Sequence, residues 1–120
     1  MPAQNGSLPD GMRWHYRIRA NGWTNALFSA QGASASSEGT LVTPTANVSS
    51  DSTARTVTLT IPGASLGKPA SLSGARLYIN TWDYDGGYRA LNGEPGPYQF
   101  GGGQPGDPLL IDETAVIEIP

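Results

Sequence analysis

The densest group of chemically capable side chains lies in one eight-residue segment. It combines three aromatic rings, two carboxylates, one guanidinium and two glycines, in the order Trp82, Asp83, Tyr84, Asp85, Gly86, Gly87, Tyr88 and Arg89. Aromatic faces stack on the apolar C–H face of a pyranose, while carboxylates and guanidinium groups make directional hydrogen bonds to its hydroxyls. The segment therefore predicts a carbohydrate-binding site.

Each predicted role follows from the chemistry of the side chain. The expected stacking platforms are Trp82, Tyr84, Tyr88 and, beside the Asn21-Gly22 turn, Trp23. The expected hydrogen-bonding set is Asp83, Asp85 and Arg89. A second interpretation stays open, in which Trp82 or Tyr84 belongs to the core and Asp85 only caps a turn.

Metal and cofactor chemistry finds little support. The chain has no cysteine and a single histidine, His15, which excludes Cys-based and multi-histidine metal sites. Asp83-x-Asp85-Gly86 resembles the start of an EF-hand loop, but its twelfth position, Glu94, is crowded by prolines. We predict no cofactor. Calcium bound by other oxygens in the region 83–113 is the alternative.

Catalysis is not predicted. A Ser-His-Asp triad would need His15, which alternates with arginines on what reads as the solvated face of a strand. Asp83 and Asp85 are two residues apart and could point to one side of an extended segment, as a glycosidase carboxylate pair must. A small glycine-rich domain has few side chains to enclose a sugar and exclude water. A hydrolase that uses these two residues is therefore kept only as an alternative hypothesis.

Composition excludes further classes. With 120 residues the chain has the length of one domain. Seven basic residues against ten acidic ones, scattered along the chain, leave no electrostatic footprint for nucleic acid. No apolar run reaches the roughly 20 residues that span a bilayer, and no export signal opens the chain. We expect neither a nucleic-acid nor a membrane partner.

Periodicity predicts an all-β fold. Period-two alternation marks strands at 13–20, 56–61 and 75–82, with further strands expected at 23–30 and 111–119. In the first of these, Trp14, Tyr16 and Ile18 should share the buried face. The piece 63–67 could form one helical turn, and the Ala/Ser-rich stretch 31–40 a loop or weak edge strand. Turn signals at short intervals favour an antiparallel β-sandwich of jelly-roll type over residues 13–120, after an irregular lead-in at 1–12.

A family resemblance adds to this reading. It rests on Arg13-Trp14-His15-Tyr16, on the turn Gly22-Trp23-Thr24-Asn25-Ala26-Leu27-Phe28, on the loop Trp82 to Arg89, and on Phe100-Gly101-Gly102-Gly103 followed by Asp107-Pro108 and Asp112. In this order the motifs resemble the C-terminal accessory domain of glucodextranase and related bacterial α-glucan hydrolases, over residues 8–119.

The resemblance implies a non-catalytic, carbohydrate-binding-module-like β-sandwich. Such a module would tether a secreted or surface-attached glycoside hydrolase, amylase-like in its substrates, to an α-glucan such as starch or dextran. The implied partners are the polysaccharide and the catalytic domain of a parent chain. The rival is a structural domain that packs on the catalytic domain without a sugar site. The family domain is nearly twice as long, so the chain resembles its second half, and the sheet edges then exposed predict a homodimer.

Overall fold

The computed structural model describes residues 8–9, 11–20, 25–34, 37–82 and 110–120. These residues form short antiparallel strands and one four-residue 3-10 turn, so the all-β prediction is confirmed. The strands are grouped into one three-stranded and three two-stranded sheets in this part of the chain.

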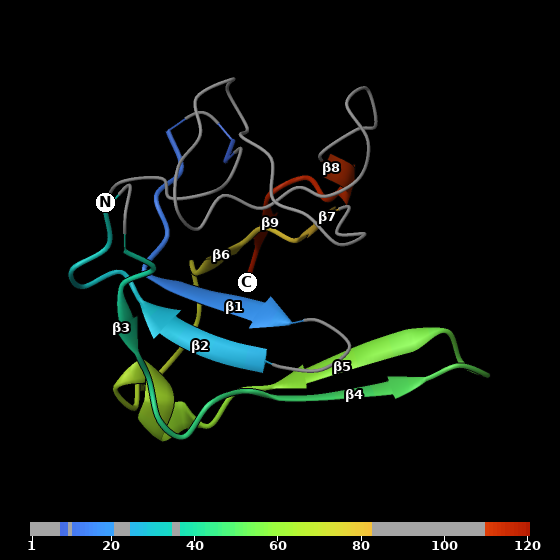
Figure 1. Cartoon of the computed structure of the whole chain (residues 1–120), viewed down its shortest axis with the longest axis horizontal. Coiled ribbons are helices and arrows are strands. Elements are labelled where there is room, and N and C mark those ends of the chain that lie inside the picture. The colour runs from blue at the N-terminus through green and yellow to red at the C-terminus, as the bar shows by residue number, and fades with distance from the viewer. Residues whose placement is uncertain (1–7, 10, 21–24, 35–36, 83–109) are drawn as a thin grey trace.

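The three-stranded sheet forms the centre of the described structure (Figure 1). It contains β1 (Tyr16–Ala20), β2 (Asn25–Ser29) and β3 (Thr40–Leu41), with β2 in the middle. Ala20 pairs with Asn25, so the connection between β1 and β2 holds four residues rather than the two that Asn-Gly alone predicts. The 31–40 stretch contributes a single bridge, between Ser34 and Ser37, and the start of β3.

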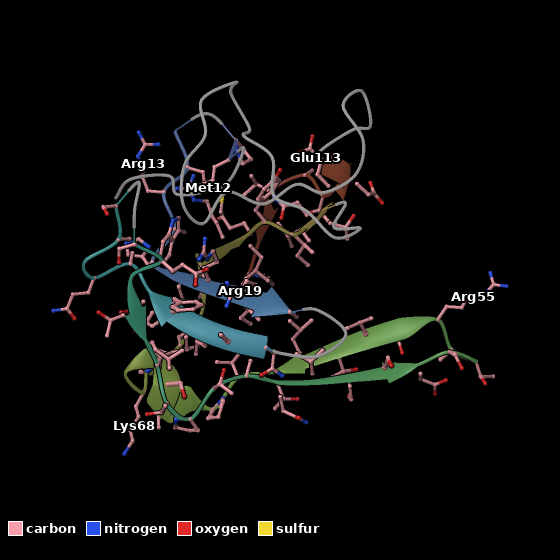
Figure 2. All side chains as sticks on the ribbon, in the orientation of Figure 1. Met12, Arg13, Arg19, Arg55, Lys68 and Glu113 are labelled. Atoms are coloured by element: carbon pink, nitrogen blue, oxygen red, sulfur yellow. The ribbon has the colours of Figure 1, made fainter. Side chains whose placement is uncertain are left out.

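A long hairpin extends beyond the central sheet (Figure 1). Its strands are β4 (Asn47–Asp51) and β5 (Thr56–Thr60). The sequence pattern predicts β5 but not β4. The Asp51 carboxylate accepts hydrogen bonds from the backbone N–H groups of Thr53 and Ala54, at 2.8 and 2.9 Å. This Asx-type turn and the left-handed backbone of Arg55, with φ of 55°, reverse the chain. Figure 2 shows Arg55 at the hairpin's tip, pointing away from the other strands.

The expected single helical turn is present as η1 (Gly63–Leu66). Its Ser65 is buried, and the hydroxyl donates a 2.6 Å hydrogen bond to the carbonyl of Pro44. Gly67 ends the turn in the left-handed conformation, with φ of 77°, which a residue lacking a Cβ adopts without strain. The turn thereby fastens the end of the hairpin to the segment that connects β3 with β4.

The predicted strands 75–82 and 111–119 pair with each other, but each is interrupted. The first gives β6 (Arg76–Leu77) and β7 (Asn80–Trp82), and the second gives β8 (Leu110–Glu113) and β9 (Ile117–Glu118). β6 pairs with β9 and β7 with β8, and the hydroxyl of Thr114 accepts from the backbone N–H of Ile79 at 3.1 Å between them. The two pairs thus form one irregular antiparallel ribbon.

The core of the described residues is small and lies on the central sheet. Leu27 is fully buried, and Trp14, Ala26, Phe28 and Ala30 pack together on the opposite side of β2. Successive residues of a strand point to opposite faces, so β2 has a buried side chain on both faces. The middle strand of the sheet is therefore covered on both of its faces.

Candidate functional site

The structure anchors the predicted sugar-binding segment at the end of a strand. Trp82 is the last residue of β7, as the sequence pattern indicates. The remaining predicted residues, namely Asp83, Tyr84, Asp85, Tyr88, Arg89 and Trp23, lie outside the described residues. Their proximity to one another, their roles as platforms or hydrogen-bond partners and the calcium alternative thus remain predictions.

The backbone at this anchor has a defined geometry. Trp82 pairs with Leu110, so the chain leaves and re-enters the described structure at neighbouring points of one antiparallel ladder. Thr81 pairs with Asp112, which leaves Ile111 as one extra residue on β8 between the two pairs. A β-bulge of this kind increases the local twist and redirects the side chains beyond it. The segment between residues 82 and 110 therefore begins and ends at one fixed, bulged strand terminus.

A tyrosine–carboxylate contact lies next to this anchor. The Tyr78 hydroxyl donates a hydrogen bond to Oε2 of Glu113, the last residue of β8, which is labelled in Figure 2. Removal of the tyrosine from water and the adjacent carboxylate raise the pKa of Tyr78, while Asn80 opposes the shift. A carboxylate beside the hydroxyl stabilises the neutral phenol and destabilises the phenolate.

This contact predicts a change in alkaline titration. Because the folded pKa is raised, the contribution of Tyr78 to stability is complete below the ordinary tyrosine pKa and is lost as pH rises through the higher folded value. Glu113→Gln should lower the pKa of Tyr78, measured as the tyrosinate absorbance missing from a Tyr78→Phe variant. Glu118→Gln, an exposed carboxylate on β9, serves as the control. An unchanged Tyr78 titration in Glu113→Gln would show that the carboxylate has no such effect.

An organised polar group lies on the central sheet and was not predicted from the sequence. Nη2 of Arg17 lies 2.7 Å from Oε1 of Glu38, and Nη1 of Arg19 lies 2.9 and 3.0 Å from the two carboxylate oxygens. The guanidinium carbons lie over aromatic rings: Arg17 over Trp14 at 5.4 Å and over Phe28 at 5.5 Å, and Arg19 over Phe28 at 5.6 Å. We call these five residues the arginine–aromatic cluster.

The cluster corrects the predicted faces of the first strand. Arg17 is paired with Phe28 across the sheet, so the two share a face, and Trp14 packs on that same face. Trp14 lies before β1, where the alternation of the strand does not yet apply. The prediction that the arginines occupy a solvated face opposite Trp14 is therefore wrong for Arg17 and Arg19. His15 is exposed.

The contacts within the cluster are of the kind that stabilise a fold rather than bind a ligand. Burial lowers the pKa of Arg17, and the charge of Glu38 opposes that effect. Trp14 is only 7% exposed, so its ring is covered and cannot serve as a stacking platform in this conformation. One carboxylate thus holds two guanidinium groups against two rings and fixes the 37–39 segment to the sheet. The signal in the sequence was Glu38, the one charged residue of an Ala/Ser/Gly-rich stretch.

The described residues contain neither a candidate metal-binding cluster nor a candidate membrane-spanning helix. No group of three or more histidine or acidic side chains gathers there in an arrangement that could hold a metal ion. The same residues contain no helix long and apolar enough to cross a membrane.

Comparison with known proteins identifies a family. Neither a curated protein nor a solved structure matched the chain. Residues 2–118 match the family model described as the C-terminal binding module, SLH-like, of glucodextranase. That match extends over nearly all of the 120 residues and includes β1 to β9. It agrees with the resemblance carried by the aromatic and glycine-rich motifs of the sequence. The chain therefore belongs to the family of C-terminal, SLH-like binding modules of glucodextranase.

Proposed function

We propose that the chain is a non-catalytic carbohydrate-binding module that tethers a secreted glycoside hydrolase to an α-glucan such as starch or dextran. The observation that carries the proposal is the family match over residues 2–118, since that family is described as a binding module. A module of this kind acts through effective concentration, because a weak site on the same polypeptide keeps a catalytic domain near its polymer. It therefore needs no catalytic residue of its own.

The proposed ligand site is the segment from Trp82 to Arg89. Its residue types suit a pyranose, and its first residue, Trp82, lies at the bulged end of the β7–β8 pair. A rigid strand end supplies a fixed attachment for a binding loop, which is where ligand-contacting residues concentrate in β-proteins. The roles proposed are stacking for Trp82, Tyr84, Tyr88 and Trp23, and hydrogen bonding for Asp83, Asp85 and Arg89.

Substitution of the proposed platforms should weaken sugar binding. Removal of one stacked ring costs about 1 to 3 kcal/mol, by analogy with the burial of a large apolar side chain. Trp82→Ala and Tyr88→Ala should each lower affinity roughly 5- to 150-fold, which would abolish retardation of a weak binder in gels that contain dextran or starch. Asp85→Asn should cost less, because the amide keeps one acceptor and water can replace the lost hydrogen bond.

A matched control for these variants exists on the central sheet. Tyr16 is 41% exposed on β1, so Tyr16→Ala removes an accessible ring that lies outside the proposed segment. Its retardation should equal that of the unmutated chain. Retardation that survives both Trp82→Ala and Tyr88→Ala would contradict the proposed site.

A structural accessory role is the second candidate. Leu77, Ile79 and Ile117 are 46, 54 and 46% exposed, and Leu77 and Ile117 are paired across β6 and β9. Exposed apolar side chains grouped in this way favour contact with another domain, here the catalytic domain of a parent chain. Tryptophan fluorescence separates the two roles: a response to soluble glucan favours binding, and a response to a catalytic domain alone favours scaffolding.

Two further proposals accompany the function. A module that holds an enzyme on a polymeric glucan works outside the cytoplasm, so we infer that it is secreted or attached to the bacterial surface. We also infer that the complete module is a β-sandwich, because the central sheet buries side chains on both of its faces.

A further inference from the structure

One edge of β5, the edge that faces away from β4, is not hydrogen-bonded to another described strand. Among the described strands, β5 is paired only with β4. All ten residues from Asp51 to Thr60 are exposed, and Val57 is 63% and Leu59 43% exposed. A two-stranded hairpin on its own is marginally stable in water, because half of its main-chain groups and one apolar face lack a protein partner.

The edge carries none of the features that usually prevent pairing. Proteins protect exposed edges with lysine, proline, inward-pointing charges or bulges. β5 reads Thr-Val-Thr-Leu-Thr from Thr56 to Thr60, with no charged residue and no proline. Its five-residue register with β4 is also unbroken, in contrast to the bulged β7–β8 pair. High β-propensity and zero charge are the properties of a strand that accepts another strand.

The sequence of β5 is self-complementary about its centre. In an antiparallel pair with a two-fold axis beside Thr58, Thr58 lies opposite its own copy and Val57 lies opposite Leu59. Thr56 then lies opposite Thr60. Residues directly opposite one another share a face, so apolar side chains meet apolar ones and threonines meet threonines. We propose that β5 pairs with β5 of a second copy of this chain, which makes a homodimer with its two-fold axis at Thr58.

The other edge of the hairpin does not fit a second copy in this way. The same operation on β4 would place Val48 opposite Ser50 and Asn47 opposite Asp51, so that apolar and polar side chains would be mixed. The β5 pair instead yields a continuous sheet in the order β4-β5-β5-β4. Ser50 is paired with Val57 and Val48 with Leu59 in each copy, so one face of that sheet collects Val48, Val57 and Leu59 from both copies. Pairing therefore satisfies the main-chain groups of the β5 edge and brings Val57 of each copy into lateral contact with Leu59 of the other.

The dimer has a consequence that rests on the proposed function. Two tethered modules on one glucan chain convert the second binding event into an intramolecular one, which raises avidity without a new contact. The assembly itself does not depend on sugar. The failure of either proposal therefore leaves the other intact.

The first test places like charges at the axis. Thr58→Lys brings two ammonium groups together in the dimer, whereas the exposed side chain leaves the monomer unaffected. Ser49→Lys is the matched control: it adds the same charge to the same face on the cross-strand partner of Thr58, away from the axis. Sedimentation should give twice the 12.5 kDa chain mass for the unmutated protein. Thr58→Lys should weaken association about five- to tenfold, and an equimolar mixture with Thr58→Glu should restore it.

The second test uses the absence of cysteine from the chain. Residues opposite each other in an antiparallel pair have Cα atoms about 4.5 or 5.5 Å apart, within the range that a disulfide spans. Thr58→Cys should therefore oxidise to a covalent dimer. Ser49→Cys should not, since the two outer strands lie three strand spacings, about 14 Å, apart. Equal cross-linking of the two variants, or an unmutated chain that stays monomeric up to high micromolar concentration, would overturn the proposal.

Discussion

Gly39→Ala is expected to destabilise the fold by about 3 to 5 kcal/mol, a large part of the stability of a small domain. A Cβ at this position would clash with the backbone carbonyl oxygen of Ser29 and lie 3.3 Å from Cη2 of Trp14. The first contact is with backbone of β2 and cannot be relieved by a side-chain rotation. Gly39 also has φ of +96°, a conformation that L-residues rarely adopt.

The neighbouring turn offers a control for the backbone component. Gly32 has φ of +73° and no atom within 4 Å of an added Cβ, so Gly32→Ala carries only the conformational cost of about 1 kcal/mol. Urea unfolding followed by circular dichroism measures both variants. If Gly39→Ala lost no more stability than Gly32→Ala, the close packing of the 37–39 segment on β2 would be contradicted.

Glu38→Gln is expected to cost about 2 to 4 kcal/mol, because it leaves two neighbouring guanidinium groups without their shared counter-charge. The side chains of Glu38 and Arg17 are 12 and 20% exposed, so water screens their interaction only in part. Arg19 is more accessible, at 34%, and contributes less of the loss. Repulsion between Arg17 and Arg19, no longer offset by the charge of Glu38, would also loosen their contacts with the Trp14 and Phe28 rings.

Salt dependence and an exposed carboxylate provide the controls for this variant. Glu118→Gln removes an exposed carboxylate from β9 and should change the free energy of unfolding by less than about 0.5 kcal/mol. High salt should reduce the Glu38→Gln deficit, since screening weakens the repulsion of the two arginines. If the unfolding free energy of Glu38→Gln lay within about 0.5 kcal/mol of that of the unmutated chain, the contacts of Glu38 with Arg17 and Arg19 would not be stabilising.

Local patterning predicted the strands whose alternation was strong. The β-branched alternation over 56–61 predicts a strand, and the structure has β5 at Thr56–Thr60, one residue shorter at its end. The piece 63–67, which follows that strand, was likewise expected to be able to form one helical turn, and the structure has η1 there. β4 was not predicted because the segment Asn47–Asp51 contains only one apolar residue. Pairing with β5 imposes the extended conformation of this segment.

The arginine–aromatic cluster could not be predicted from the alternation of residues along the sequence. Alternation assigns a face within a strand, but it does not say where the strand begins. Since β1 begins at Tyr16, Trp14 turned to the opposite side from the one predicted. Nor does the sequence show that Glu38, some twenty residues away, covers the face of Arg17 and Arg19. Such long-range pairings depend on the path of the whole chain.

The candidate site was predicted from residue types and stays a prediction, whereas the strand that leads into it is part of the described structure. Trp82 ends β7 where the pattern indicates, and the pairing of Trp82 with Leu110 adds that both ends of the segment meet at one strand terminus. Sequence reasoning could not supply that pairing, because the two residues are separated by the Gly- and Pro-rich stretch 83–109.

Electrophoresis of the unmutated chain in native gels that contain dextran or soluble starch tests the central claim most directly. A binding module predicts retardation that grows with polysaccharide concentration and disappears when free oligosaccharide of the same linkage is added. A protein of similar size without a sugar site provides the mobility reference. Mobility equal to that reference at every concentration of both glucans would contradict α-glucan binding.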